Sequence, residues 1–292
     1  MYSLPLVVME FHIALSTEEV CSLLAEDPTR EILAGGTDFM VEVNFRQKDP
    51  SAVIAIDRVP ELKQWRHDGD AVSIGSCVTY REIERGPLST IVPALAQSAR
   101  TIGSPQIRNV ATIGGNLGTA SPAGDMIPVL LALDAKVTIR SINGSRDVSI
   151  DGLITGVKET SLDDNEFIEA IKVPILKGPQ EFLKVGPRNA MVISIASLAM
   201  VTDPEQATIA IALGSVTAAP SRAREAEEYI EGFLDWDAMT VSSSVLPNFR
   251  RLVGEASSPI NDHRSSAAYR THAVGVLGQR ALLRIFESRD DG

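Results

Sequence analysis

The sequence predicts an α+β protein with two domains, and three patterns along the chain support this fold class. Residues 1–57 alternate short apolar strands with helices in the order β-α-β-α-β, which predicts a small parallel sheet. Residues 58–177 mix strands and helices and predict a mixed sheet. Residues 178–292 begin with apolar strands and continue with helices, which predicts an α+β domain with a three-stranded antiparallel sheet. We therefore expect one domain at 1–177, divided at residue 57, and a second at 178–292, with the boundary at Lys177-Gly-Pro179.

Apolar runs and capping signals define the elements of the first 57 residues. Ser16 followed by Glu19 forms a capping box, which predicts a helix that ends before Pro28. Gly35-Gly36 closes the second strand, and a short helix is expected from Asp38 to about residue 46. The predicted strands cover residues 11–14, 31–34 and 52–56.

Turn signals and apolar runs also predict the elements of residues 58–292. Asn143-Gly144 between two strand-like runs is a strong hairpin signal, and Pro128 marks the first turn of an apolar helix. Between residues 58 and 177 we expect strands at 71–74, 136–140, 146–150 and 166–173 and helices at 79–85, 93–99 and 126–134. Beyond residue 178 we expect strands near 181–186, 191–201 and 207–214 and helices at about 222–231, 236–249 and 265–287.

Composition and charge limit the class of partner. The net charge is −11 and the pI is near 4.9, which argues against binding to nucleic acid or to an anionic membrane. No apolar run approaches the roughly 18 residues of a membrane span, and residues 4–9 lack the basic flank of a signal peptide. The cytoplasm is therefore the expected compartment.

The cysteines and histidines do not form a metal site. Cys21 and Cys77 are too few for an iron–sulfur cluster or a structural zinc ion, and we expect both to be buried as small apolar side chains. The four histidines show no ligand spacing. No metal ligand and no catalytic acid–base pair is therefore assigned to this chain.

Two polar Gly-Gly segments are the candidate binding elements: Leu33-Ala-Gly-Gly-Thr-Asp38 and Thr112-Ile-Gly-Gly-Asn116. Glycine lets a ligand approach the backbone closely, and the start of a helix offers N–H groups to phosphate. Each segment alone is more typical of a simple turn than of a binding loop, and neither has the pattern of a Walker loop or a Rossmann fingerprint. Together they favour a long ligand with a diphosphate, gripped from two sides. Side chains that can add contacts are Thr37, Thr112, Asn116, Thr119, Ser121 and Asp125.

Three segments carry a family resemblance: ILAGGTDFM (32–40), IRNVATIGGNLGTASPAGDMIPVLLALDA (107–135) and FLKVGPRNAMVISIASLAM (182–200). In this order they resemble the FAD-binding (medium) subunit of the molybdenum hydroxylases, which include xanthine dehydrogenases and carbon monoxide dehydrogenase. The resemblance covers nearly the whole chain, and the second segment is the most specific. It implies an FAD-binding domain of the vanillyl-alcohol-oxidase/MurB (PCMH) type, followed by a smaller C-terminal domain.

The resemblance also implies which residues contact a non-covalently bound FAD. Lys184 matches a lysine beside the flavin, although a solvated strand-end cation is an equal alternative for it and for Arg188. Ile102 matches a position that packs on the flavin, and Ile168 matches an apolar contact near the flavin ring or the adenine. Plain core packing is the alternative for both. Met191 replaces an acidic residue that many relatives carry three positions after the arginine, so the role of that acid is in doubt here. The full set is Ile32, Leu33, Ala34, Gly35, Gly36, Thr37, Asp38, Phe39, Ile102, Thr112, Gly114, Gly115, Asn116, Ser121, Asp125, Ile168 and Lys184.

In the family this subunit relays electrons. The resemblance implies that a large partner subunit holds the molybdenum cofactor and a small one holds two [2Fe–2S] clusters. Electrons would pass from these clusters to FAD and then to an external acceptor, and the expected assembly is a dimer of heterotrimers. Two alternatives stay open: a self-sufficient flavin oxidase or reductase of the same fold, and a scaffold subunit without FAD.

Overall fold

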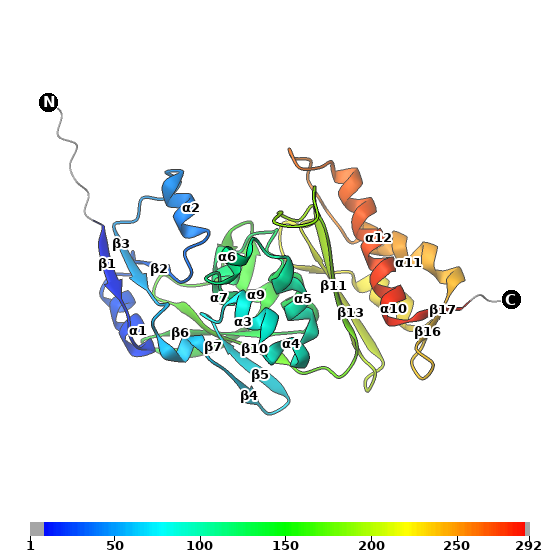
Figure 1. Cartoon of the computed structure of the whole chain (residues 1–292), viewed down its shortest axis with the longest axis horizontal. Coiled ribbons are helices and arrows are strands. Elements are labelled where there is room, and N and C mark those ends of the chain that lie inside the picture. The colour runs from blue at the N-terminus through cyan, green and yellow to red at the C-terminus, as the bar shows by residue number, and fades with distance from the viewer. Residues whose placement is uncertain (1–8, 290–292) are drawn as a thin grey trace.

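The computed structural model describes residues 9–289, and three sheets follow one another along its long axis (Figure 1). The N-terminal and middle sheets lie within the first 174 residues, and the third sheet lies between them and the C-terminal helices. The α+β class and the order of the sheets are as predicted.

The N-terminal sheet is parallel, with strand order β1-β3-β2. Ser16 caps the following helix by accepting from the amide of Glu19, but the Glu19 carboxylate accepts from Leu15 rather than from Ser16, so only half of the predicted capping box forms. The helix buries Val20, Cys21 and Leu24 against the sheet. The elements are β1 Glu10–Ile13, α1 Thr17–Glu26, β2 Glu31–Leu33, α2 Phe39–Asn44 and β3 Ala52–Ala55.

The middle sheet has five strands in the order β4-β5-β10-β6-β7. All the pairings of this sheet are antiparallel, so the predicted mixed sheet is wrong. The hairpin of β6 and β7 turns through Ile142 and Asn143, because Ser141 pairs with Gly144. This sheet and its helices enclose the largest apolar core. The strands are β4 Trp65–Asp68, β5 Ala71–Gly75, β6 Lys136–Ser141, β7 Gly144–Ser149 and β10 Phe167–Pro174, with a two-stranded sheet of β8 Ile154–Gly156 and β9 Glu159–Thr160. The helices are η1 Pro60–Lys63, α3 Tyr80–Arg85, α4 Leu88–Ile91, α5 Pro93–Thr101, α6 Pro105–Arg108, α7 Ile113–Thr119, α8 Met126–Ala132 and α9 Ile150–Leu153.

The third sheet has four antiparallel strands rather than the predicted three, because the short strand β14 pairs with β13. The sheet is buried on both faces. Ala199 and Val201 of β12 belong to the middle core, whereas Leu198 and Met200 belong to the core under the C-terminal helices. The strands are β11 Gln180–Val185, β12 Ala196–Asp203, β13 Thr208–Gly214 and β14 Ser221–Arg222.

The C-terminal helices cover the outer face of this sheet (Figure 1). They are α10 Arg224–Glu231, α11 Leu246–Glu255 and α12 Ala267–Ile285. The predicted helix at 236–249 is wrong in its first part: β16 (Thr240–Ser242) pairs with β15 (Leu234–Asp235) and with β17 (Glu287–Arg289), and η2 (Ser243–Val245) leads into α11. The strand predicted from residue 191 begins at Ala196, because residues 187–193 form a loop.

Candidate cofactor site

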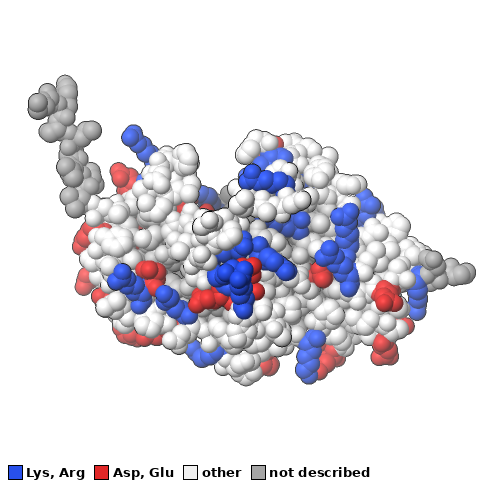
Figure 2. All heavy atoms as spheres, in the orientation of Figure 1, with Lys and Arg blue, Asp and Glu red and all other residues white. Residues whose placement is uncertain are grey.

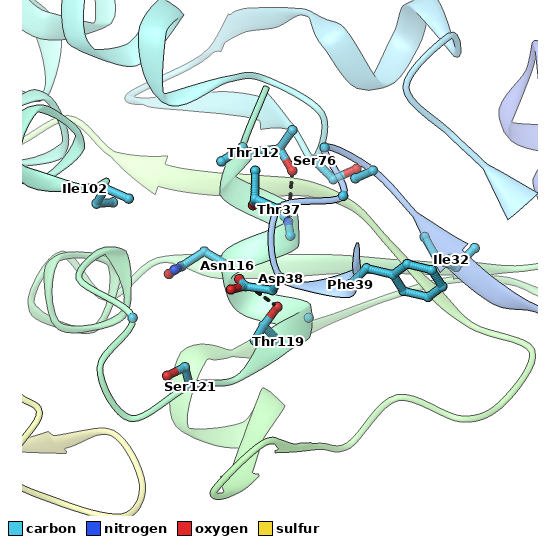
Figure 3. A pocket seen from close by; sticks show the side chains of 18 of the residues that line it. Ile32, Thr37, Asp38, Phe39, Ser76, Ile102, Thr112, Asn116, Thr119 and Ser121 are labelled. Carbon is cyan, nitrogen blue, oxygen red and sulfur yellow. Dashed lines mark hydrogen bonds between the residues drawn. The ribbon is translucent and has the colours of Figure 1, made fainter. Parts of the chain in front are cut away.

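A pocket of about 710 Å³ lies between the turn after β2 and helix α7. Its volume falls within the range typical of small-molecule and cofactor sites. Of the predicted site residues, all but Leu33 and Lys184 line it. Figure 3 shows polar side chains in its middle, among them Asp38, Asn116 and Thr119, with Ile102 on one side and Phe39 and Ile32 on the other.

The turn after β2 presents its backbone to the pocket. Gly36 has φ +70°, a left-handed conformation that favours glycine. Gly35 packs so closely that a Cβ there would lie 1.9 Å from the carbonyl oxygen of Val110. Among the described residues, the amides from Gly35 to Phe39 have no hydrogen-bond partner. Successive unpaired N–H groups of this kind can bind an anion such as a diphosphate.

Helix α7 contains the TIGGN segment, which is therefore not the loop that the sequence predicted. Its first amides are satisfied within the protein. Those of Ile113, Gly114, Gly115 and Asn116 donate to Val78 O, Ser76 O, Thr112 Oγ1 and Thr112 O at 3.1, 2.9, 3.0 and 3.1 Å. A Cβ on Gly114 would lie 2.4 Å from Cβ of Ser76, so this glycine lets the helix pack against the residue after β5. Neither Gly114 nor Gly115 has positive φ.

Two buried oxygen atoms beside the pocket have no partner among the described residues: Ser76 Oγ and Asn116 Oδ1. Such atoms are rare in folded proteins, and a bound ligand is one way to satisfy them. Tyr80 also lines the pocket, and burial raises the pKa of its hydroxyl well above the ordinary value, so the hydroxyl stays protonated. The sequence analysis missed Ser76 and Tyr80, because both precede the glycine segment by more than thirty residues and belong to no motif.

Two polar contacts join the walls across the pocket. The Thr119 hydroxyl donates to Asp38 at 3.4 Å (Figure 3), and Lys158 donates to Glu42 of α2 at 2.5 Å. Helix α2 buries none of its side chains, so these contacts help to hold it over the site. Lys48 and Glu31 form a further ion pair in the pocket lining.

Asp125, at the start of α8, is the only carboxylate of the lining that is fully buried among the described residues. Lys184 of β11 donates to its Oδ2 at 2.5 Å, and Ser194 donates to its Oδ1 at 3.0 Å. Burial raises the pKa of the Asp125 carboxyl, although Lys184 and Ser194 oppose this change. Lys184 is thus buried and paired behind Asp125, and it is neither a solvated cation nor a part of the pocket lining.

The loop at residues 187–193 borders the same pocket. Arg188 is exposed and donates to the carbonyls of Ala190 and Met191, which fits its reading as a solvated cation. Met191 has φ +51° and lines the pocket together with Val192 and Ile193. An apolar group therefore stands at the position where the family resemblance leads us to expect an acid.

The positions of Ile102 and Ile168 are consistent with both predictions for them, contact with the cofactor and packing in the core. Ile168 is buried in the middle core, Ile102 packs against that core, and both line the pocket. Apolar groups for ring systems, unpaired amides for a diphosphate and buried oxygen acceptors for hydroxyl groups are the contacts that FAD requires. The residues present therefore fit this cofactor.

The described residues contain no group of three or more His, Cys, Asp or Glu that could hold a metal ion. Cys21 and Cys77 are free and buried, as expected. Within the same part of the chain, no helix has both the length and the apolar character needed to cross a membrane.

Comparisons with known proteins identify the family of the chain. Residues 7–176 match the FAD binding domain in molybdopterin dehydrogenase, and residues 181–285 match the CO dehydrogenase flavoprotein C-terminal domain. The chain is 31% identical to the glyceraldehyde dehydrogenase medium chain of Sulfolobus acidocaldarius, covering 93% of this chain and 96% of the relative. It is 32% identical to the nicotinate dehydrogenase FAD-subunit of Eubacterium barkeri, covering 97% and 98%.

The fold agrees as well. A chain in the crystal structure of carbon monoxide dehydrogenase from Hydrogenophaga pseudoflava superposes with a TM-score of 0.87 at 28% identity, covering 95% of this chain and 96% of that one. Sequence, fold and pocket thus lead to one family. The chain belongs to the molybdenum hydroxylases as their FAD-binding medium subunit, and it is a flavoprotein component of an oxidoreductase.

Proposed function

We propose that this subunit takes electrons from iron–sulfur clusters of a partner chain and passes them to an external acceptor. The observation that carries the proposal is the row of unpaired amides at residues 35–39 opposite the acceptors Ser76 and Asn116, in a chain that belongs to this family. FAD supplies redox chemistry that exchanges electrons singly or in pairs. The protein's part is to bind and orient the cofactor.

The positions of the residues that line the pocket suggest which part of FAD each would contact. The amides of the turn after β2 would hold the diphosphate, and Thr37 and Thr112 stand beside them. Asp125 can accept hydrogen bonds from hydroxyl groups, whereas Ile102, Ile168 and Phe39 offer apolar contacts to rings. These assignments follow from the chemical character of the groups that line the pocket.

The proposed binding is non-covalent. Covalent flavin attachment usually requires a His or Cys nucleophile, and the described pocket lining contains neither. Acid precipitation of the yellow protein should therefore release all the flavin into the supernatant. Flavin that stays in the pellet would contradict this part of the proposal.

The proposed partners are a small [2Fe–2S] subunit and a large subunit with the molybdenum cofactor, assembled as a dimer of heterotrimers. The two relatives above are a medium chain and an FAD-subunit, and the Hydrogenophaga pseudoflava enzyme was crystallised in a form that lacks the Mo-pyranopterin moiety of the molybdenum cofactor. On the face seen in Figure 2, basic and acidic side chains are interspersed. With a net charge of −11, we expect a more basic partner surface and assembly that slows as salt is raised.

One reconstitution experiment tests the relay. The isolated subunit should be reduced by dithionite but not by the organic substrate of the complex. Adding the small and large subunits should restore flavin reduction by that substrate. If the isolated chain is reduced by the substrate as fast as the full complex, it is a self-sufficient oxidase and the relay is wrong. If it never binds FAD, it is a scaffold.

A further inference from the structure

A chain of hydrogen bonds leads from the pocket wall to the C-terminal helices. It starts at Asp125, whose Oδ1 accepts from Ser194 at 3.0 Å. The hydroxyls of Ser194 and Ser215 share a hydrogen bond of 2.6 Å. Arg270 of α12 then donates to the carbonyl of Ser215 at 3.0 Å and to that of Ile195 at 2.7 Å. Every link therefore lies within ordinary hydrogen-bond distance.

Ser215, in the middle of this chain, has an unusual backbone. Its φ is +64°, which a non-glycine residue adopts at a cost of about 1 kcal/mol or more. Its amide donates to the carbonyl of Pro122, in the segment that precedes Asp125. A Cβ on the preceding Gly214 would lie 3.0 Å from Pro128 of α8, so this strand end packs tightly against the helix that Asp125 begins. The strained turn is thus fixed against the pocket wall.

Arg270 is the buried anchor at the other end. Its side chain is 4% exposed, and a buried guanidinium is costly unless it is paired and hydrogen-bonded. Asp262 pairs with it at 2.7 Å and also accepts from the amides of Arg264 and Ser265. Partial burial tends to raise the pKa of Asp262, but these bonds outweigh it and lower the pKa to about 2, so the pair stays charged at neutral pH.

We propose that Arg270 is a positioning residue for the cofactor site, acting through Ser194 and Ser215 on Asp125. By fixing the carbonyls of Ile195 and Ser215, Arg270 sets where the two serine hydroxyls lie. The Ser194 hydroxyl, itself bonded to that of Ser215, holds Oδ1 of the Asp125 carboxylate, whereas Lys184 holds Oδ2. The orientation of the carboxylate toward the pocket therefore depends on helix α12. The inference rests on the proposed contact of Asp125 with FAD.

The alternative is that Arg270 only stabilises the fold. Measuring the affinity of the folded protein for FAD distinguishes this structural role from the positioning role. Arg270→Lys keeps the charge but loses the paired geometry of the guanidinium. It should raise the dissociation constant of FAD for the folded protein by about 3- to 30-fold, from the usual size of coupling within a hydrogen-bond network. A structural role alone would lower the melting temperature and leave the affinity of the folded protein unchanged.

A double-mutant cycle then tests the route. A Ser194→Ala background removes the side-chain link between Arg270 and the Asp125 carboxylate. If this link is the route, Arg270→Lys should no longer change the dissociation constant there, although it should still lower the melting temperature. Arg264→Gln is the matched control, because Arg264 pairs with the same Asp262 at 3.3 Å but does not touch the serines. It should change FAD affinity less than about twofold.

The outcomes are distinct. An equal effect of Arg270→Lys in both backgrounds, or none in either, would overturn the proposed route. If Arg270→Lys does not fold, Asp262→Asn takes its place in the same cycle, with a smaller expected shift in the same direction. Asp125→Asn is measured alongside, and unchanged affinity in that variant would remove the proposed contact with FAD and the inference with it.

Discussion

The two Gly-Gly segments have similar sequences but different backbone states. In the turn after β2, the amides from Gly35 to Phe39 have no partner among the described residues, whereas the first amides of α7 all donate to protein atoms. The first segment therefore offers backbone to a ligand. The second uses glycine to bring a helix against Ser76 and offers side-chain atoms instead. Glycine pairs beside one cofactor can thus serve ligand contact in one place and protein packing in the other.

The largest effect should come from Gly114→Ala, which tests packing at the second segment. The added Cβ would lie 2.4 Å from Ser76 Cβ and 2.7 Å from Ser76 O, and neither backbone can move freely. We expect a loss of about 3 kcal/mol or more in the free energy of unfolding, measured by denaturant titration without FAD. A stable variant that only binds FAD more weakly would show that Gly114 serves the ligand rather than the packing.

The next effect concerns Gly36→Ala in the first segment. A Cβ there would make a tight contact of 3.3 Å with Leu33 Cδ1, so the leucine side chain would have to shift slightly. In addition, φ +70° costs a non-glycine residue about 1–2 kcal/mol. If the turn relaxes, its amides no longer converge, and the FAD dissociation constant should rise by about 10-fold or more. Gly69→Ala is the control, since Gly69 has φ +65° with no atom within 4 Å and lies outside the pocket lining. It should lower stability similarly and leave FAD binding unchanged.

A smaller effect is expected from Ser76→Ala. Ser76 Oγ has no partner among the described residues, so its removal should leave the stability of the FAD-free protein unchanged or slightly higher, while FAD binding weakens by about 3- to 10-fold. Ser197→Ala removes another buried, unpaired hydroxyl outside the pocket lining. Isothermal titration should show weaker binding for the first variant only. Equal FAD affinity in both would mean that Ser76 makes no ligand contact.

The smallest effect should come from Gly118→Ala, in the same helix as Gly114. A Cβ there would meet no atom within 4 Å, and alanine favours a helix over glycine by up to about 1 kcal/mol. We expect a melting temperature a few degrees higher in the absence of FAD, measured by calorimetry. A destabilised variant would contradict the view that only the buried side of α7 requires glycine.

The sequence predicted much of the fold because most of its signals are local. The parallel opening, the hairpin at residues 136–149 and the helix at Pro128 each follow from neighbouring residues. Helix α7 could not be predicted in this way, because three glycines in seven residues disfavour a helix and its first turn depends on the carbonyls of Ser76 and Val78. The strand at Thr240–Ser242 was missed because it is only three residues long, its local partner β15 has two residues, and its parallel partner β17 lies more than forty residues away.

The sequence predicted which segments form the site, but it did not predict the contacts that their atoms make. Family motifs led to the turn after β2 and to α7, but no local pattern shows that one presents free amides and the other does not. The pair of Lys184 with Asp125 joins residues that are 59 positions apart, and Ser194 completes it from a third segment. Such contacts depend on how the third sheet packs against α8, which only the folded chain defines.

The sheet that is buried on both faces has a consequence for protein engineering. Alternate residues of β12 complete two different cores, so neither half of the chain carries a closed apolar interior of its own. A fragment cut after residue 177 would lose Phe182, Ala199 and Val201 from its interior and expose the apolar surface that they cover. A chimera that joins this N-terminal half to the C-terminal half of a relative must therefore match the inward face of the foreign strands to the recipient's helices α5 and α8, as carefully as one would redesign an obligate dimer interface.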